Sequence, residues 1–205
     1  MSDNSLKEPI QDIPYRDLRP SARLIGNYGV LFMLWGWAGL IKFILDYIEK
    51  YTYISISLKQ GVEILGYIVV TFWLAGTLYL LYRHGTMKLT YFGLILRFIW
   101  ISMIMSMVMF NVIQMNVLNN VNFEFQHPVF MIFYAFATVV SGGILKQKML
   151  VMGGIVFALC AFVSSYLELK DQLALEAVAF LAAFIIPGHL MYAKGRKEKS
   201  IHLYQ

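Results

Sequence analysis

The chain has 205 residues, of which 59% are hydrophobic and only 14% are charged, and its mean hydropathy is +0.63. Soluble domains carry about a quarter charged residues, so the composition argues against an ordinary water-soluble protein. The formal net charge of +5 comes from basic residues scattered near the ends of apolar segments. They form no extended basic patch, so we expect no nucleic-acid partner.

Six apolar segments account for most of the chain. Each is close to the roughly twenty residues that an α-helix needs to cross about 30 Å of hydrocarbon. The apolar runs are nearly continuous and lack the two-residue alternation of barrel strands, so each predicts a spanning helix. The fold class is therefore predicted as all-α: a polytopic membrane protein with a bundle of six transmembrane helices. The predicted spans are residues 27–48, 62–82, 90–115, 128–146, 149–167 and 172–192.

The remaining residues predict two tails around a single transmembrane domain. Residues 1–26 are polar, contain prolines and acidic residues and lack an apolar stretch, so we expect a tail rather than a secretion signal. Residues 27–192 form the predicted six-helix domain, and residues 193–205 a short basic tail. The single cysteine, Cys160, excludes an intrachain disulfide and is expected to pack as a small apolar residue.

The distribution of the 17 lysines and arginines predicts the orientation. Most lie in the two tails and in the loops after the second and fourth spans, which all face one side of the membrane. Only Lys50, Lys59 and Lys170 lie on the opposite side. Cytoplasmic loops carry the excess of basic residues, so both termini are predicted to be cytoplasmic. The predicted location is a bacterial cytoplasmic (inner) membrane, with the lipid bilayer as the main partner.

Glycines and tryptophans indicate how the helices pack. The fourth and fifth spans are joined by about two residues, and glycine pairs at Gly142-Gly143 and Gly153-Gly154 flank the turn. Small residues let helix backbones approach closely in lipid, so a tight antiparallel hairpin is predicted there. The four tryptophans are expected to pack between helices: Trp35, Trp37, Trp73 and Trp100.

Arg97 is the clearest candidate for a functional residue. It lies about eight residues into the third span, or roughly 12 Å along the helix axis. An arginine at mid-helix costs about 2.5–3.5 kcal/mol on insertion scales, so it needs a partner or must extend towards the cytoplasmic surface. Two interpretations remain open: a structural role, and a contact with a substrate or anion.

A second set of charged residues lies near the opposite face. Lys42 and Asp46 are four residues apart on the first helix, and Glu63 is near the start of the second. Charges at this spacing form pairs on one helix face. They predict either a neutralised interfacial ring, to which Glu176 also belongs, or a vestibule for a cation or polar solute.

The inner end of the last span combines Pro187 and Gly188 with His189. Proline and glycine predict a kink or a helix exit there. A cluster of Arg97, Ser141 and His189 would raise an enzymatic alternative, which requires a Ser–His contact near about 3 Å. The four histidines are too scattered to predict metal or haem ligands, so no metal, cofactor or catalytic residue is assigned: they are His84, His127, His189 and His202.

Three stretches carry a family resemblance: Leu34-Trp35-Gly36-Trp37, the stretch from Val140 to Lys146 that runs on through Gly153-Gly154, and the stretch from Ile185 to Leu190. They resemble a family of bacterial six-helix integral membrane proteins for which no activity is established. The resemblance implies the six-helix inner-membrane architecture and gives no residue a chemical role. It does not extend to the third span, so it adds nothing to the case for Arg97.

Three functional classes follow. The first is a protein that binds or transports a small solute or ion through the bundle, with Arg97 in its path. The second is an interaction or regulatory subunit that docks on a membrane partner or on copies of itself. The third is an intramembrane enzyme acting on lipid or peptide. The sequence favours the first class, and an enzyme is the less favoured interpretation. The candidate binding residues are Arg97, Ser141, His189, Lys42, Asp46 and Glu63.

Overall fold

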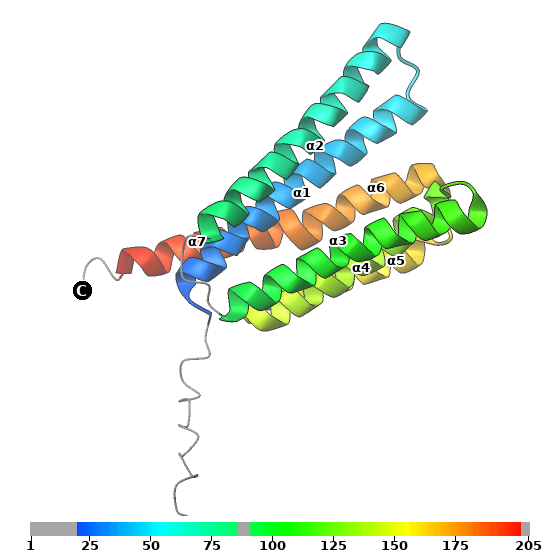
Figure 1. Ribbon diagram of the computed structural model, residues 1–205. Coiled ribbons are helices and arrows are strands. Elements are labelled where there is room, and N and C mark those ends of the chain that lie inside the picture. Colours follow the sequence, from blue (N-terminus) through cyan, green and yellow to red (C-terminus); the bar gives the residue numbers. More distant parts are fainter. Residues whose placement is uncertain (1–19, 86–90, 202–205) are drawn as a thin grey trace, which may run out of the picture.

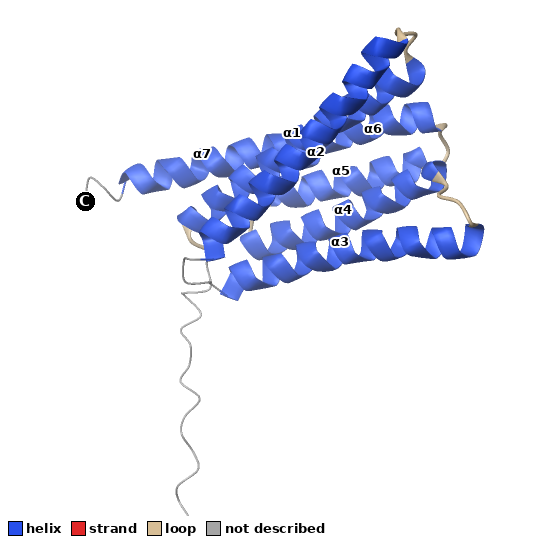
Figure 2. Cartoon of the chain, turned by 45° about the horizontal axis from the view of Figure 1, so that its top comes forward, coloured by secondary structure: helices blue, strands red, loops and turns tan. Residues whose placement is uncertain are grey.

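The computed structural model describes residues 20–85 and 91–201, and all regular structure in these ranges is helical (Figures 1 and 2). The all-α prediction is confirmed. The predicted tail is described only from residue 20 onwards, and His84 and His202 have no described side chain. The elements are α1 (Ala22–Tyr51), α2 (Ile56–Gly85), α3 (Tyr91–Leu118), α4 (Phe123–Leu145), α5 (Lys148–Ser164), α6 (Leu169–Phe180), η2 (Leu181–Ile185) and α7 (Ile186–Ile201).

Five helical stretches are long and apolar enough to cross a membrane. They are α1, α2, α3, α4 and the continuous rod formed by α6, η2 and α7. The fifth predicted span, residues 149–167, corresponds to α5, which has only 17 residues and falls below this length. The helices extend past the predicted spans at most of their ends, because polar residues continue the helix beyond the apolar run. The chain is thus a multi-pass membrane protein.

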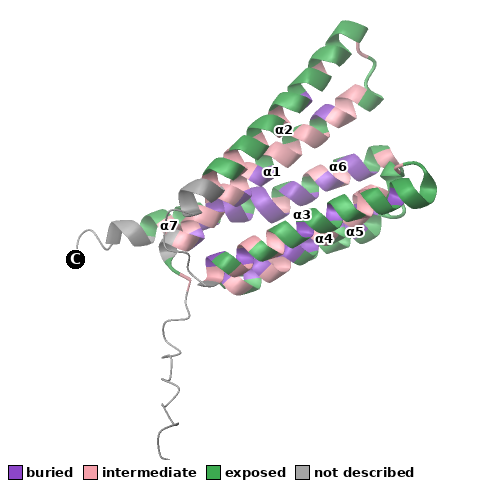
Figure 3. Cartoon of the chain, in the orientation of Figure 1, coloured by how far each residue is buried: buried purple, intermediate pink, exposed green. Residues whose placement is uncertain are grey.

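The rod of α6, η2 and α7 lies at the centre of the bundle (Figure 1). α1 packs along it on one side and carries α2 on its outer surface. On the other side, α4 and α5 pack together, α5 contacts the rod, and α3 lies against α4. α2 is the most peripheral helix: only 6% of its apolar window is buried, and it is almost entirely exposed in Figure 3.

α1 and α7 approach so closely that glycine is required on both helices. A β-carbon on Gly29 would lie 2.7 Å from the backbone nitrogen of Tyr192 and 2.9 Å from the carbonyl oxygen of Gly188. One on Gly188 would lie 2.9 Å from the backbone nitrogen of Met33. Nearer the start of α1, Gly26 faces Gly195. The register is antiparallel, so α1 begins near the point where α7 leaves the bundle.

The predicted hairpin of α4 and α5 is confirmed. α4 ends at Lys146, which adopts a left-handed conformation with φ 53°, and Gln147 precedes α5. A β-carbon on Gly142 would lie 2.7 Å from the backbone nitrogen of Val151, so this glycine sets the close approach. Gly143, its neighbour, faces open space, with nothing within 4 Å of such a carbon. The expectation that both glycines serve the hairpin is wrong for Gly143.

Pro187 does not end the last helix. The helix continues to Ile201, and the change falls before the proline, where residues Leu181–Ile185 form a π-helical turn. The backbone N–H of Ile186 donates to the carbonyl of Leu181, five residues earlier. A proline lacks the N–H of a regular helix turn and its ring crowds the preceding turn, and a π-turn absorbs such a mismatch. Of the two predicted alternatives, a kink or a helix exit, the exit is wrong, and the disturbance of the helix takes the form of a π-turn.

Aromatic side chains form the core where the rod meets its neighbours. Phe157 on α5, Tyr134 on α4, and Phe180 and Phe184 on the rod are buried against one another, with ring centroids 5.1–6.1 Å apart. Offset and edge-to-face pairs at these distances add to the packing energy. This core holds α4 and α5 on the rod, and it leaves the neighbouring interface between α1 and α3 less filled.

Candidate functional site

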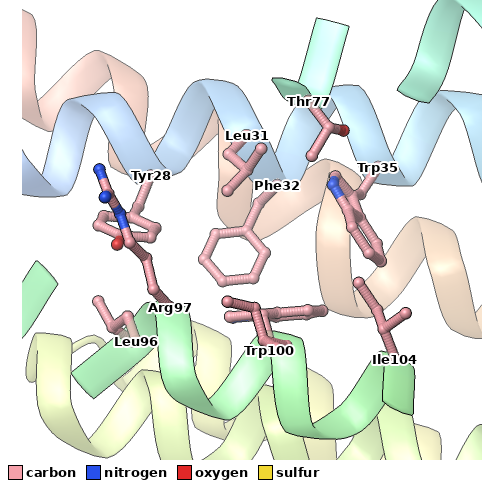
Figure 4. Close-up of a pocket in the computed structure, with 10 residues that line it drawn as sticks. Tyr28, Leu31, Phe32, Trp35, Thr77, Leu96, Arg97, Trp100 and Ile104 are labelled. Atoms are coloured by element: carbon pink, nitrogen blue, oxygen red, sulfur yellow. The ribbon is translucent and has the colours of Figure 1, made fainter. Parts of the chain in front are cut away.

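A groove of about 220 Å³ lies between α1 and α3 with α2 at its edge (Figure 4). Its walls are almost entirely apolar. Ile101 and Ile104 line it while 54% and 42% of their surfaces are exposed, so the groove opens sideways, towards the lipid-facing surface of the bundle. The lining residues are Tyr28, Leu31, Phe32, Trp35, Thr77, Leu96, Arg97, Trp100, Ile101 and Ile104.

Arg97 lies at one end of the groove beside Tyr28 (Figure 4). The two side chains are close enough to interact electrostatically. The Tyr28 hydroxyl donates to the carbonyl oxygen of Gly93 at 3.2 Å, which fixes the phenol against the first turn of α3. Arg97 is six residues after Tyr91, the first residue of α3, or about 9 Å along the axis. α3 has 28 residues, so Arg97 lies about 12 Å from the middle of the helix and belongs to its outer half.

Trp35 and Trp100 form the aromatic wall of the groove. Their ring centroids are 5.1 Å apart, and Trp73 on α2 meets Trp35 edge-on at 4.8 Å. The Trp100 indole nitrogen donates to the Ser141 hydroxyl on α4 at 3.1 Å. Three tryptophans thus pack between helices as predicted. The prediction is wrong for Trp37, whose side chain is 46% exposed.

The end of the groove away from Arg97 contains buried polar atoms without a hydrogen-bond partner. They include the indole nitrogen of Trp35 and the hydroxyl oxygen of Thr77, both of which line the groove. The indole nitrogen of Trp73, which packs against Trp35 outside the groove lining, is unpaired as well. An unpaired buried polar atom costs about 1–3 kcal/mol. These atoms give the deep end of the groove donors that a polar atom of a bound molecule would satisfy after a small rearrangement.

Ser141 and His189 are not brought together. Ser141 is fully buried and accepts the hydrogen bond from Trp100. His189 is exposed, donates from Nδ1 to the carbonyl of Ile185 at 2.8 Å, and meets Trp37 edge-on at 6.5 Å. No hydrogen bond joins the two side chains, both of which the structure describes. The Ser–His contact that the enzymatic alternative requires is not formed.

The charged residues at the other end of the bundle, Lys42, Asp46 and Glu63, do not form one cluster. Lys42 and Asp46 form the predicted ion pair along α1. Glu63 instead accepts a hydrogen bond from the hydroxyl of Tyr67, one turn along the exposed face of α2, at 3.3 Å. Among the described residues, no ion pair or hydrogen bond joins Glu63 to Lys42 or Asp46.

Glu176 lies inside the bundle, and its partner is His127. The carboxylate Oε2 is 2.6 Å from the imidazole Nδ1, and the Glu176 side chain is 2% exposed. The sequence interpretation assigned Glu176 to the interfacial ring and gave His127 no role. The two residues are 49 positions apart on different helices, so no local spacing indicates the contact. The one available signal was a glutamate in the apolar face of the last span.

Comparison with protein-family models, curated proteins and solved structures found no match. The three resembling stretches therefore identify no family, and the functional interpretation depends on the geometry of the groove and of the His127–Glu176 pair.

Proposed function

We propose that the protein binds, within the membrane, an amphiphilic molecule that carries a negatively charged group. The observation that supports this proposal is the groove of α1 and α3, which combines an apolar wall, a sideways opening and one arginine at its end. A membrane lipid or a lipid-like solute has the same arrangement, with its charge at one end of an apolar body.

The position of Arg97 along the membrane normal supports the same chemistry. Seven residues separate Arg97 from Ile104, so the lined part of the groove runs for about 10 Å from the charge towards the bundle centre. An anionic group at Arg97 and Tyr28 would lie near the headgroup layer, while the apolar body would lie against Phe32, Trp35 and Trp100. An inorganic ion has no apolar part and would make no contact with this apolar wall.

This proposal narrows the first functional class from the sequence, a small solute or ion in the helix bundle. The interaction-subunit alternative would draw on α2, whose exposed face also fits contact with lipid. The enzymatic alternative would need a different arrangement of Ser141 and His189. Transport of the bound molecule is a more specific version of this proposal. It would require the groove to open at both ends of the bundle.

The test measures lipid retention by the purified protein. The full chain is reconstituted into mixed vesicles of phosphatidylglycerol and phosphatidylcholine, extracted into detergent, and the retained lipid is quantified by native mass spectrometry. We expect enrichment of the anionic lipid. Arg97→Gln should reduce that enrichment about fivefold, since one basic residue near the headgroups contributes about 1 kcal/mol. Lys148→Gln removes an exposed cation after α4 and serves as the matched control.

A second variant tests the groove itself. Ile101→Trp adds volume to a lining residue that faces the lipid and should lower retention of both lipids without changing their ratio. Unchanged enrichment in Arg97→Gln, together with unchanged total lipid retention in Ile101→Trp, would overturn the proposal, because it would place the retained lipid elsewhere on the surface. Loss of enrichment in the Lys148→Gln control would show a general dependence on net charge and would also contradict it.

A further inference from the structure

The His127–Glu176 pair is a buried titratable site that the groove does not use. His127 is in the first turns of α4 and Glu176 is two turns into α6, so the pair joins α4 to the central rod at the end opposite to Arg97. The imidazole keeps 16% of its surface exposed, whereas the carboxylate keeps 2%. Of the two side chains, the histidine is thus the one that reaches the surface of the bundle.

The surroundings of the pair are apolar rings and uncharged hydrogen bonds. Phe43 on α1 meets the imidazole edge-on at 6.3 Å. Gln172, one turn before Glu176, donates to the carbonyls of Glu124 on α4, Ser164 at the end of α5, and Leu167 in the following turn, at 2.9–3.1 Å. The Gln172 amide nitrogen therefore links three segments around the pair, and it donates only to backbone carbonyls.

Few charged or titratable groups face the pair. From α1, Asp46 is close enough to interact electrostatically with Glu176, and Asp46 is itself paired with Lys42. From α4, besides His127, the buried Tyr134 interacts with Glu176. α5 reaches this level with Ser164, whose backbone carbonyl accepts from Gln172 and whose hydroxyl does not titrate. No cation other than His127 pairs with Glu176 among the described residues.

This composition favours a proton over a metal ion as the bound species. No group of three histidine, cysteine, aspartate or glutamate side chains is close enough to hold a metal among the described residues. A lone buried carboxylate carries a large desolvation cost, and a single added proton makes the pair electrically neutral. A permanently structural ion pair would be equally neutral, but it would have no reason to keep its imidazole partly exposed.

We propose that His127 and Glu176 form a proton-binding site that is loaded through the imidazole. In the unloaded pair, the neutral His127 donates its Nδ1 proton to the ionised Glu176. An incoming proton binds Nε2, and the Nδ1 proton passes to Glu176 Oε2. The loaded pair is then a carboxylic acid beside a neutral imidazole protonated on Nε2. The pair has gained one proton and one positive charge, and no other co-reactant is required.

Infrared difference spectroscopy of the full chain in lipid nanodiscs tests this site directly, because a carboxylic acid absorbs apart from the carboxylate and amide bands. On acidification, wild type should gain a carboxylic-acid band from a buried group. Glu176→Gln, which keeps an oxygen acceptor for His127, should lose that band. Glu168→Gln removes an exposed carboxylate at the start of α6 and should keep it.

The second variant separates loading from a static contact. In His127→Gln, hydrogen–deuterium exchange at the Glu176 carboxyl should slow about 10²-fold or more, the scale of catalysis by a positioned acid–base group. A Glu176→Gln protein that keeps the wild-type band would overturn the proposal, as would a wild type without the band. Unchanged exchange in His127→Gln would refute loading through the imidazole. None of these measurements involves a groove ligand, so they stand or fall apart from the proposed lipid binding.

Discussion

The hydrogen bond between Trp100 and Ser141 sets the position of a groove wall. Ser141 is fully buried on α4, and it is the partner that the Trp100 indole nitrogen meets at 3.1 Å. Trp100 in turn packs against Phe32 and Trp35 of α1. One hydroxyl on a third helix therefore orients the ring that separates the groove from the rest of the bundle.

Ser141→Ala should destabilise the protein by about 0.6 kcal/mol, the average for side-chain hydrogen bonds between membrane helices, and by no more than about 1.7 kcal/mol. The indole N–H would remain buried without its partner. Detergent-induced unfolding followed by tryptophan fluorescence measures the change. The control introduces Ser141→Ala into a Trp100→Phe protein. There the indole N–H is absent, so Ser141→Ala should no longer lower the stability. Additive effects of the two changes would mean that the bond contributes nothing.

Sequence information was sufficient for some of these residues and insufficient for others. Arg97 was recognisable because a charge inside an apolar run is costly wherever the helix packs. The pairing of His127 with Glu176 was not, because it depends on how α4 lies on α6. Ser141 was singled out as a potential partner of His189, yet the structure gives it to Trp100. Helix rotation decides such contacts, and apolar helices that differ little around their circumference do not reveal it.

Gly142 and Gly143 show how one residue step on a helix changes the role of the same amino acid. Gly142 faces α5 at a distance that excludes a β-carbon, and Gly143 faces open space. Gly142→Ala should therefore force α4 and α5 apart and cost about 1–3 kcal/mol, as overpacked sites do. Gly143→Ala, the matched control, should leave unfolding in detergent unchanged. Equal losses in both variants would indicate a backbone requirement shared by the pair instead of a contact.

The helices themselves were largely predictable. A run of apolar residues must satisfy its backbone hydrogen bonds internally in lipid, so element type follows from composition. The ends were less accurate, because helices such as α7 continue as polar extensions beyond the apolar run. The π-turn before Pro187 was not predicted, because a proline predicts a kink or an exit without indicating how neighbouring turns absorb the disturbance.

In the whole molecule, the two candidate sites occupy opposite ends of the interfaces around the central rod. The groove with Arg97 lies where α1 and α3 diverge, and the His127–Glu176 pair joins α4 to the start of α6. α3 packs chiefly on α4, and α1 packs along the rod. A movement of α3 and α4 relative to α1 and the rod would therefore change both sites together. Each site is formed by side chains from more than one helix, so neither can be recognised from one helix alone.

The orientation of the bundle is the last prediction. α1 begins and α7 ends at one end of the molecule, as the contact of Gly26 with Gly195 shows. The basic residues predict that this end is cytoplasmic. α5 is shorter than the hydrocarbon layer, since its 17 residues span only about 25 Å against about 30 Å. A shortfall of this size costs fractions of a kcal/mol per Å, so we expect α5 to cross.

Single cysteines in a Cys160→Ala background test both points with a membrane-impermeant maleimide applied to sealed vesicles of known orientation. The reagent applied from the non-cytoplasmic side should label Ser55→Cys, between α1 and α2, and Tyr166→Cys, after α5. It should reach Lys148→Cys and Lys197→Cys only from the cytoplasmic side. Labelling of Lys148→Cys and Tyr166→Cys from one side would show that α5 does not cross. Labelling of Lys197→Cys from the non-cytoplasmic side would invert the orientation and place Arg97 in the opposite leaflet.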